Sequence, residues 1–290
     1  MFVKINRILK WFGLILGGIV GVAVLGVAIN YLLIGRDLSR TFDVAVDEID
    51  ILDDQAGIDE GERLARIRGC FGCHGDNVAG QVFFEFFDGT TYVAPDLAAA
   101  SQAYSAAELD RVIRHGIRPD GTSVLLPMPS EMFYNLSDED FGSIIGFLRS
   151  QTPATEPLPE SYLGPVARVM LTMFKQETGT ILAAEAIDHA SPRSDSSPEN
   201  AENFGKYIAM TTCTECHGKD LLGAFDGEFP PLTIVAAYSL KDFTTLMRTG
   251  VPIGDRELDL MATVAVGRFS YFTDMEITAL HTFLKTLVNQ

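Results

Sequence analysis

The residues best suited to chemistry in this sequence are cysteines and histidines that occur twice at the same spacing. The two copies are Cys70-Phe71-Gly72-Cys73-His74 and Cys213-Thr214-Glu215-Cys216-His217. In each copy, two thiols three positions apart can bond the two vinyl groups of a porphyrin, and the adjacent imidazole can meet its iron. The spacing therefore predicts two covalently bound c-type haems, with His74 and His217 as iron ligands.

Cysteine usage bears on the alternatives to haem. The sequence contains 4 Cys, so two attachment sites use all of them and leave none for a disulfide. A thioredoxin-type redox pair also has the C-x-x-C spacing, but it does not require a following His. A zinc site could use two such pairs, but it would leave both histidines unexplained.

The charge of the chain is strongly negative and unevenly distributed. A net charge of −17 argues against nucleic acid as a partner. Residues 1–35 carry three basic groups and no acidic one, whereas residues 36–150 carry 9 basic and 21 acidic groups. Residues 151–290 carry 10 basic and 18 acidic groups. The acidic surface either steers a basic partner or keeps the protein soluble.

An apolar segment near the N-terminus predicts a membrane span. Trp11 to Gly35 is a run of 25 uncharged residues, long enough to cross a hydrocarbon core of roughly 30 Å. Lys4, Arg7 and Lys10 precede it, which predicts that the N-terminus stays in the cytoplasm. The alternative is a cleaved signal peptide, but its apolar region would be shorter and no small-x-small cleavage site follows the run.

The second half of the chain repeats the plan of the first. Residues 104–116 match residues 238–250, which lie 134 positions later, and the haem motifs lie 143 positions apart. We therefore expect extra residues in the first copy and place them at 81–92. A helix is expected from about Ile58 into the first motif, and Ser137 and Thr273 each predict the start of a final helix.

Two further segments are open to more than one interpretation. The Pro- and Ser-rich stretch between the copies is expected to be irregular, but its apolar part at 166–174 predicts a short helix. We expect that helix to pack within this protein. The alternatives are that it contacts a partner subunit or the membrane surface. Four Phe in residues 82–87 either shield a haem face from water, belong to the core or form a docking patch.

Each half resembles a class I cytochrome c: a helix enters C-x-x-C-H-G, and a middle helix, a Met and a final helix follow. Residues 55–290 are similar to the membrane-bound dihaem cytochromes c of bacterial respiratory chains and periplasmic dehydrogenases. The resemblance implies an all-α fold with an N-terminal transmembrane helix and two class I cytochrome c domains. The expected divisions are an anchor at 1–40, an acidic tether at 41–57, a first domain at 58–151, a linker at 152–202 and a second domain at 203–290.

The resemblance also implies a set of ligands around each haem. In the family a Met thioether is the sixth iron ligand, and the matching residues are Met128, which precedes Pro129, and Met261, which lacks a following Pro. We expect Met261 on a connecting loop. Met132 is expected to fill the core, and Met170 and Met173 are expected to be packing residues. Met247 is expected on the middle helix and Met275 inside the final one.

Other residues support the ligands or lie apart from them. The family holds the axial imidazole with a Pro carbonyl, which matches Pro95 and Pro230, with Pro231 as a substitute for Pro230. Arg114 and Arg248 end the middle helices, where each either binds a haem propionate or caps the last carbonyls. Of the histidines outside the motifs, His115 is expected at the surface or as a cap at a helix C-terminus, and His281 is expected to be exposed to solvent. No motif surrounds His189 or His281.

An iron that holds both His and Met has no open coordination site, which favours electron transfer over catalysis. The first hypothesis is an electron carrier between a quinol-oxidising complex or dehydrogenase and a terminal acceptor. The second is a permanently bound dihaem subunit of an oxidase or dehydrogenase, and the third is a dihaem peroxidase, which the two Met candidates disfavour. The resemblance implies haem domains in the periplasm and an anchor in the bacterial inner membrane.

Overall fold

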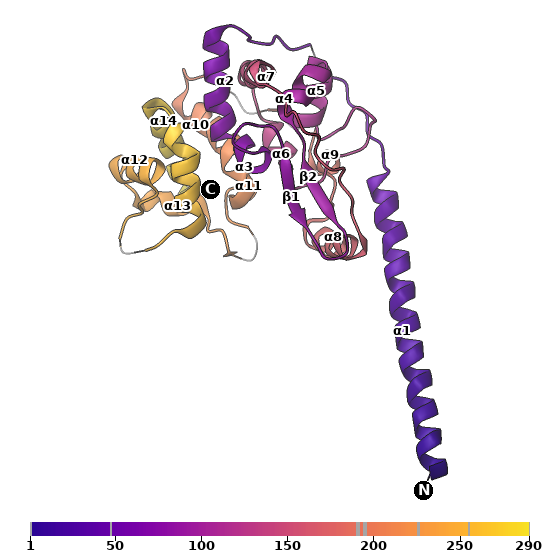
Figure 1. Ribbon diagram of the computed structural model, residues 1–290. Helices are drawn as coiled ribbons and strands as arrows, with labels where there is room; N and C mark the ends of the chain where they lie inside the picture. Colours follow the sequence, from indigo (N-terminus) through magenta and orange to yellow (C-terminus); the bar gives the residue numbers. More distant parts are fainter. Residues whose placement is uncertain are drawn as a thin grey trace.

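The computed structural model describes residues 2–46, 48–189, 192–193, 196–224, 227–254 and 256–289. Two helical lobes lie side by side, and one long helix, α1 (Phe2–Leu38), extends away from them (Figure 1). Within α1, Lys10–Leu38 is long and apolar enough to cross a membrane, and its most apolar window has no residue buried in the protein. A signal sequence meets the same criteria of length and composition. The side chains of Lys4 and Arg7, on which the predicted orientation depends, lie outside the described part.

The first lobe is built on the crossing of its first and last long helices. Gly61 lies where they cross, because a Cβ there would overlap the carbonyl group of Ser143. Leu64, Phe141 and Ile145 fill the core beside this crossing. The helices of this lobe are α2 (Gln55–Ile67), α3 (Cys70–His74), α4 (Leu97–Ala103), α5 (Ala106–Ile113), α6 (Ser130–Phe133) and α7 (Asp138–Ser150).

The second lobe repeats this arrangement. Gly205 meets the carbonyl group of Ala279 at the equivalent crossing, and Ile208, Phe243 and Leu280 are buried around it. Its elements are α10 (Ala201–Thr212), α11 (Thr214–His217), η2 (Leu232–Ala237), α12 (Leu240–Thr249), α13 (Asp259–Gly267), η3 (Phe269–Tyr271), α14 (Asp274–Thr286) and η4 (Leu287–Asn289).

Capping residues fix where the repeated helices begin. Ser137 caps α7 through the amide of Asp140, and Thr273 forms a reciprocal capping box with Glu276 on α14, as the sequence predicts. Between α2 and the first motif lies Gly69, with a φ of +80° that favours glycine, whereas Cys213 directly follows α10. Gly69 is thus an additional residue in the first copy. Because of it, the sequence separation between the two motifs is one residue shorter than the separation between the helices that precede them.

The expected all-α fold is wrong in one place. The insert in the first copy forms an antiparallel hairpin of β1 (Gln81–Glu85) and β2 (Thr91–Ala94). Phe84 stacks on Tyr92 across it with ring centroids 5.2 Å apart, and Phe87 at its tip is 93% exposed. The insert is therefore a projecting hairpin whose tip is not core.

Two connecting segments are more ordered than expected. The acidic segment 41–57 is not a free tether: the amides of Phe42 and Leu52 donate to Gly121 and Gly142 of the first lobe. The linker 152–202 contains α8 (Pro165–Thr178) and α9 (Ala183–Ala186), and residues 190, 191, 194 and 195 of this predicted linker lie outside the described residues. Both segments fold against the first lobe instead of spanning open space.

Candidate functional site

The first motif forms the short helix α3, and a loop from β2 holds its histidine. His74 is buried, and its Nδ1 atom lies 2.8 Å from the carbonyl oxygen of Pro95. Burial lowers the pKa of His74, and the bond to Pro95 opposes that shift only in part. The imidazole is therefore neutral at pH 7, with Nδ1 donating to Pro95 and Nε2 as the nitrogen that can bind a metal.

The second motif reproduces this geometry. The Nδ1 atom of His217 lies 2.8 Å from the carbonyl oxygen of Pro230, so the neighbouring Pro231 does not take that position. His217 is half-buried, and burial lowers its pKa despite the opposing bond to Pro230. Both halves of the chain thus present a neutral imidazole oriented by a proline carbonyl.

The four cysteines of the two motifs are not paired in disulfides, so all four sulfurs are available for haem attachment. Burial raises the pKa of Cys70 to about 11 and also raises the pKa of Cys213, so both are protonated at neutral pH. Among the described residues, no group of three or more His, Cys, Asp or Glu is placed to hold a metal ion.

The two methionines proposed as ligands occupy different kinds of structure. Met128 lies in the turn before α6 and packs, half-buried, against the core of the first lobe. Met261 lies in the first turn of α13 and not on a loop as expected, and it packs against the core of the second lobe. Met132 is buried in the core, as predicted. Met247 lies on α12 and Met275 on α14, the helices on which they were expected; Met247 is buried and Met275 is 59% exposed.

The arginines at the ends of the middle helices join those helices to the final ones. Arg114 donates from Nη1 to the carboxylate of Asp138 at 2.6 Å, and Arg248 donates from Nη2 to Asp274 at 2.9 Å. Each also donates to a carbonyl before the final helix, that of Leu136 or Ser270. Neither set of bonds caps the carbonyls of the middle helix itself. Binding of a haem propionate by these arginines remains a prediction.

One of the remaining histidines differs from the exposed position expected. His281 is buried, and its Nε2 lies 3.0 Å from the carbonyl oxygen of Tyr238. His115 stacks on the exposed His189, with ring centroids 5.2 Å apart. Burial and the neighbouring His189 lower the pKa of His115 to about 4.

One arginine that sequence reasoning missed lies between the two motifs. Arg268, at the end of α13, donates from Nε to the carbonyl of Ile67 at 3.0 Å and from Nη1 to Glu215 at 3.1 Å. Ile67 ends the helix that enters the first motif, and Glu215 lies inside the second. Its side chain is 19% exposed, and its positive charge acts on the thiols of Cys70 and Cys213, one in each motif. No sequence pattern marks it, because its role depends on how the lobes face one another.

The two lobes exchange a further pair of contacts. Arg63 on α2 reaches Glu276 at the start of α14 with two hydrogen bonds of 2.8 and 3.0 Å. In the opposite direction, the hydroxyl of Tyr207 on α10 donates to Asp140 at the start of α7. Each donor lies two residues after the glycine at the helix crossing of its own lobe. Each acceptor lies three residues after the N-cap of the final helix in the other lobe. The contacts are therefore equivalent and reciprocal, which relates the lobes by an approximate twofold axis.

The donor set of the chain fits a c-type haem. Each motif supplies two thiols and an oriented imidazole, and a candidate Met follows each motif later in the chain. Among the described side chains, the Nη2 atom of Arg268 and the Nε and Nη1 atoms of Arg68 are buried without a hydrogen-bond partner. Buried guanidinium nitrogens require acceptors, and a carboxylate is the acceptor that suits them best. The propionates of a haem would supply such carboxylates.

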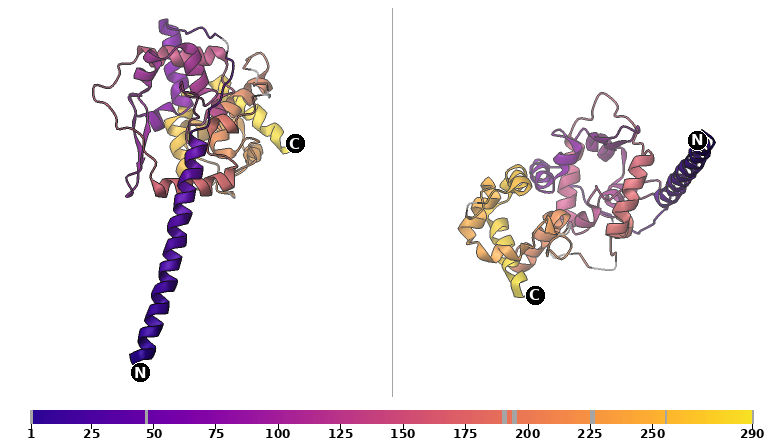
Figure 2. Two further views of the ribbon diagram at one scale, coloured as in Figure 1. Left: turned by 90° about the vertical axis from the view of Figure 1, so that its right-hand side faces the viewer. Right: turned by 90° about the horizontal axis from the view of Figure 1, so that it is seen from below.

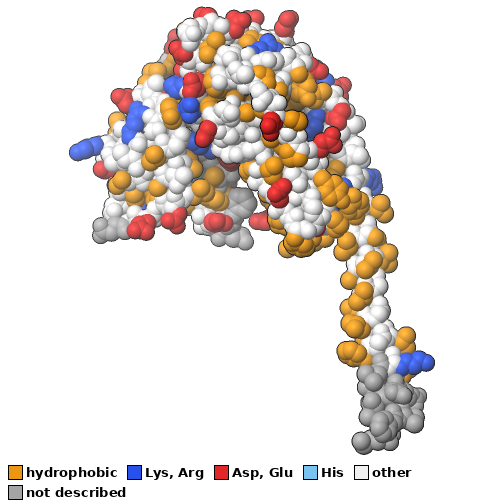
Figure 3. Space-filling view, viewed as in Figure 1, with side chains coloured by type: hydrophobic (Ala, Val, Ile, Leu, Met, Phe, Trp, Pro, Cys, Tyr) orange, Lys and Arg blue, Asp and Glu red, His pale blue; other side chains and the backbone are white. Residues whose placement is uncertain are grey.

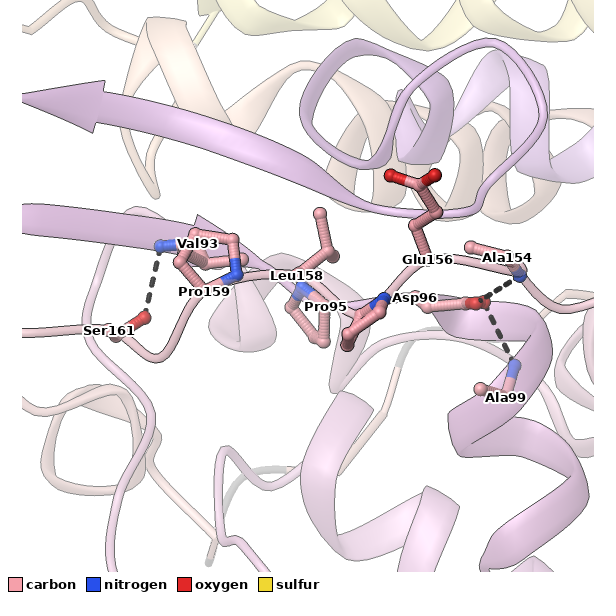
Figure 4. Close-up of a pocket in the computed structure, with 10 residues that line it drawn as sticks. Val93, Pro95, Asp96, Ala99, Ala154, Glu156, Leu158, Pro159 and Ser161 are labelled. Carbon is pink, nitrogen blue, oxygen red and sulfur yellow. Dashed lines mark hydrogen bonds between the residues drawn. The ribbon is translucent and has the colours of Figure 1, made fainter.

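The loop that carries Pro95 is covered by the linker between the lobes. The carboxylate of Asp96 accepts bonds from the amides of Ala99 at 2.9 Å and Ala154 at 2.7 Å, and it joins α4 to the linker (Figure 4). Leu158 fills the space above Gly80, where a Cβ would overlap it. The linker thus fixes the carbonyl that orients His74.

Comparison with known proteins agrees with this arrangement. Residues 58–152 match the cytochrome c family. The chain is 24% identical to the cytochrome subunit of fructose dehydrogenase from Gluconobacter japonicus over 259 residues, which are 79% of this chain and 52% of the relative. It is 25% identical to the cytochrome c subunit of the alcohol dehydrogenase (quinone) from Gluconacetobacter polyoxogenes over 296 residues, 88% of this chain and 59% of the relative.

A third relative is the cytochrome c subunit of gluconate 2-dehydrogenase from Pantoea cypripedii, 29% identical over 135 residues that cover 40% of this chain and 31% of the relative. The chain spans little more than half the length of the first two relatives. All three are named as cytochrome subunits and not as catalytic ones, which agrees with the prediction of a cytochrome c rather than an enzyme. Residues 58–152 thus form a cytochrome c domain, whose cofactor is a covalently bound c-type haem.

Proposed function

We propose that this chain is a membrane-anchored dihaem cytochrome c that carries electrons for a periplasmic dehydrogenase. In this proposal both lobes are cytochrome c domains, and α1 spans the bacterial inner membrane with the N-terminus in the cytoplasm. The lobes then lie in the periplasm, where c-type haem is attached in bacteria. The observation that carries the proposal is the repeated motif, because each copy has its histidine 2.8 Å from a proline carbonyl.

The residues of each lobe would hold one haem. Cys70 and Cys73 bond the first porphyrin and Cys213 and Cys216 the second, with an axial histidine following each pair. A bound haem supplies a reversible one-electron change at its iron. The proline carbonyls orient the imidazoles, and Met128 and Met261 complete the ligand sets. Such closed ligand sets favour electron transfer over peroxide chemistry.

The arrangement of the lobes supports electron transfer between two sites in one chain. Arg268 binds the end of the helix entering the first motif and a side chain inside the second. The paired contacts of Arg63 and Tyr207 hold the approximate twofold arrangement. These bonds fix the two motifs relative to one another without a flexible hinge between them.

The relatives favour a bound subunit over a free carrier, because their names describe cytochrome subunits of dehydrogenases. We propose the same role here, with a dehydrogenase as electron donor and an acceptor on the periplasmic side. Purification of the chain from its native membrane in mild detergent tests this. Copurification of a catalytic dehydrogenase subunit supports the proposal, whereas a chain that purifies alone with two haems indicates a mobile carrier.

Redox titration of single variants tests the ligand assignment. Met128→Ala should lower the potential of one haem and remove its Met–iron charge-transfer band, because a thioether ligand favours ferrous iron. Met261→Ala should do the same to the other haem. Met275→Ala is the matched control, because this exposed methionine is assigned no ligand role. Survival of both bands in both ligand variants would show that the assignment is wrong.

A further inference from the structure

An exposed apolar surface lies on the underside of the first lobe. On α8, Val169, Met170 and Met173 form one face of the helix, and they are 37%, 50% and 66% exposed. The expectation that Met170 and Met173 pack inside the protein is therefore wrong. Leu171 and Phe174 point the other way and pack against the first lobe. The helix is amphipathic, and no described element of this chain covers its outer face.

The tip of the β1–β2 hairpin extends the same surface. The carboxylate of Asp88 accepts the amide of Val166 at 2.8 Å, and the hydroxyl of Thr90 accepts the amide of Gly164 at 3.0 Å. These bonds fix the tip at the beginning of α8. Phe87, beside Asp88, is 93% exposed. Figure 3 shows apolar side chains gathered on this underside, next to the C-terminal end of the long helix.

The position of α8 along α1 suggests what covers this surface. Arg168 donates to the carbonyl of Tyr31 at 3.0 Å, and its guanidinium lies 3.8 Å from the centre of the Tyr31 ring. Lys175 binds Asp37 at 2.6 Å. From Trp11 to Tyr31 the helix rises about 30 Å at 1.5 Å per residue, which matches the thickness of a hydrocarbon core. The contacts with α8 therefore begin where the hydrocarbon would end.

The orientation of α8 also fits a position at the membrane surface. The left view of Figure 2 shows α8 running across the axis of α1 at the base of the lobes, and Figure 1 shows it nearly end-on beside α1. A helix crosswise to a membrane span lies in the plane of the membrane. An amphipathic helix in that plane places its apolar face among the lipid headgroups and upper acyl chains.

We propose that Phe87, Val169, Met170 and Met173 form a lipid-binding foot that inserts into the bilayer crossed by α1. The apolar face is continuous with the lipid-facing surface of α1, and it points in the direction in which α1 leaves the lobes. The foot gives the first lobe a second membrane contact, which fixes the height and tilt of the haem motifs above the lipid. This inference rests on the proposed membrane span.

Methionine oxidation in lipid nanodiscs tests the foot with the full haem-loaded chain. One chain is placed in each phosphatidylcholine–phosphatidylglycerol disc and treated with a water-soluble oxidant, and each Met is followed by peptide mass spectrometry. Met275 is the internal control, because its 59% exposure lies between the values for Met170 and Met173. We expect Met170 and Met173 to oxidise several-fold more slowly than Met275. A Phe87→Met variant should carry a protected Met at the hairpin tip.

Three outcomes would overturn the foot. Equal oxidation of Met170, Met173 and Met275 in single-chain discs would show that lipid does not cover the surface. A partner protein would then be the occupant of this surface. Protection that appears only when two chains share a disc would indicate self-association. A chain that carries two haems but does not enter the discs would refute the membrane span, and the haem count would show that the dihaem proposal stands independently.

Discussion

The contact between Arg63 and Glu276 is expected to couple the two lobes energetically. We consider Arg63→Met, which keeps much of the side-chain stem, Glu276→Gln, which keeps a residue able to complete the capping box, and the double variant. The pair forms two charge-assisted bonds of 2.8 and 3.0 Å, with side chains 23% and 9% exposed. A double-mutant cycle isolates their interaction from the separate effects of each substitution.

The expected coupling energy follows from burial and from the remaining partner of the arginine. A hydrogen bond to a charged group contributes about 1.5–3 kcal/mol, whereas an exposed ion pair contributes about 0.2–1 kcal/mol. Arg63 is partly exposed and also binds Glu60, so the value should lie between these ranges. We expect a coupling of about 1.5 kcal/mol, and a smaller one at high salt.

Urea unfolding of the full chain in mild detergent, followed by circular dichroism, measures this cycle. Arg149→Met combined with Glu276→Gln is the matched control, because Arg149 binds carbonyls within the first lobe. The control cycle should be additive. A coupling between Arg63 and Glu276 that is no larger than in the control would refute the inference that this contact joins the lobes.

The coupling between Arg63 and Glu276 is also expected to depend on pH. Burial alone would raise the pKa of Glu276, but its bonds to Arg63 and Thr273 and the charge of Arg63 outweigh burial and lower it overall. A carboxyl group with a lowered pKa in the folded state stabilises the fold above its unfolded value, and this stabilisation is lost as pH falls through the folded pKa. The coupling in the cycle should therefore be constant near pH 7 and decrease in acid below about pH 4.5.

Three other predictions concern single sites. Arg268→Gln should lower the potentials of both haems, because a buried positive charge beside both motifs favours the reduced state; Arg268→Lys should restore part of the loss in a redox titration. His115→Gln should flatten the rise in unfolding free energy expected between about pH 4 and 6.5, because the neutral imidazole is the folded form; a wild-type curve that is already flat there would contradict this. Gly61→Ala should destabilise the first lobe by about 3 kcal/mol through overlap at the helix crossing, whereas Gly72→Ala, with open space around it, should have little effect in urea unfolding.

Much of the local structure near the motifs follows from short-range rules that a sequence displays directly. Capping residues before apolar stripes mark the starts of α7 and α14. The prolines that follow the motifs mark the carbonyls that contact His74 and His217. The repeat also placed the insert correctly at the hairpin. These features depend on residues close together in the chain or on a pattern present twice.

The remaining features depend on contacts between distant segments, which no local pattern reveals. The Phe-rich insert forms a hairpin although its apolar run does not alternate as a half-buried strand does. Met261 lies on a helix, and His281 is buried against a carbonyl of a different element. The role of Arg268 and the exposure of Met170 and Met173 arise only when the lobes and α1 are assembled. Sequence alone therefore predicts the chemistry of each half better than the geometry between them.

The central claim is that both motifs carry a covalently attached haem, and the most direct measurement is a count of free thiols in the denatured protein. The purified full chain is unfolded, treated with an alkylating reagent and weighed intact by mass spectrometry. We expect a mass that includes two haems and no alkylated cysteine among the 4 in the chain. A mass with one haem or none, and two or more alkylated cysteines, would contradict it.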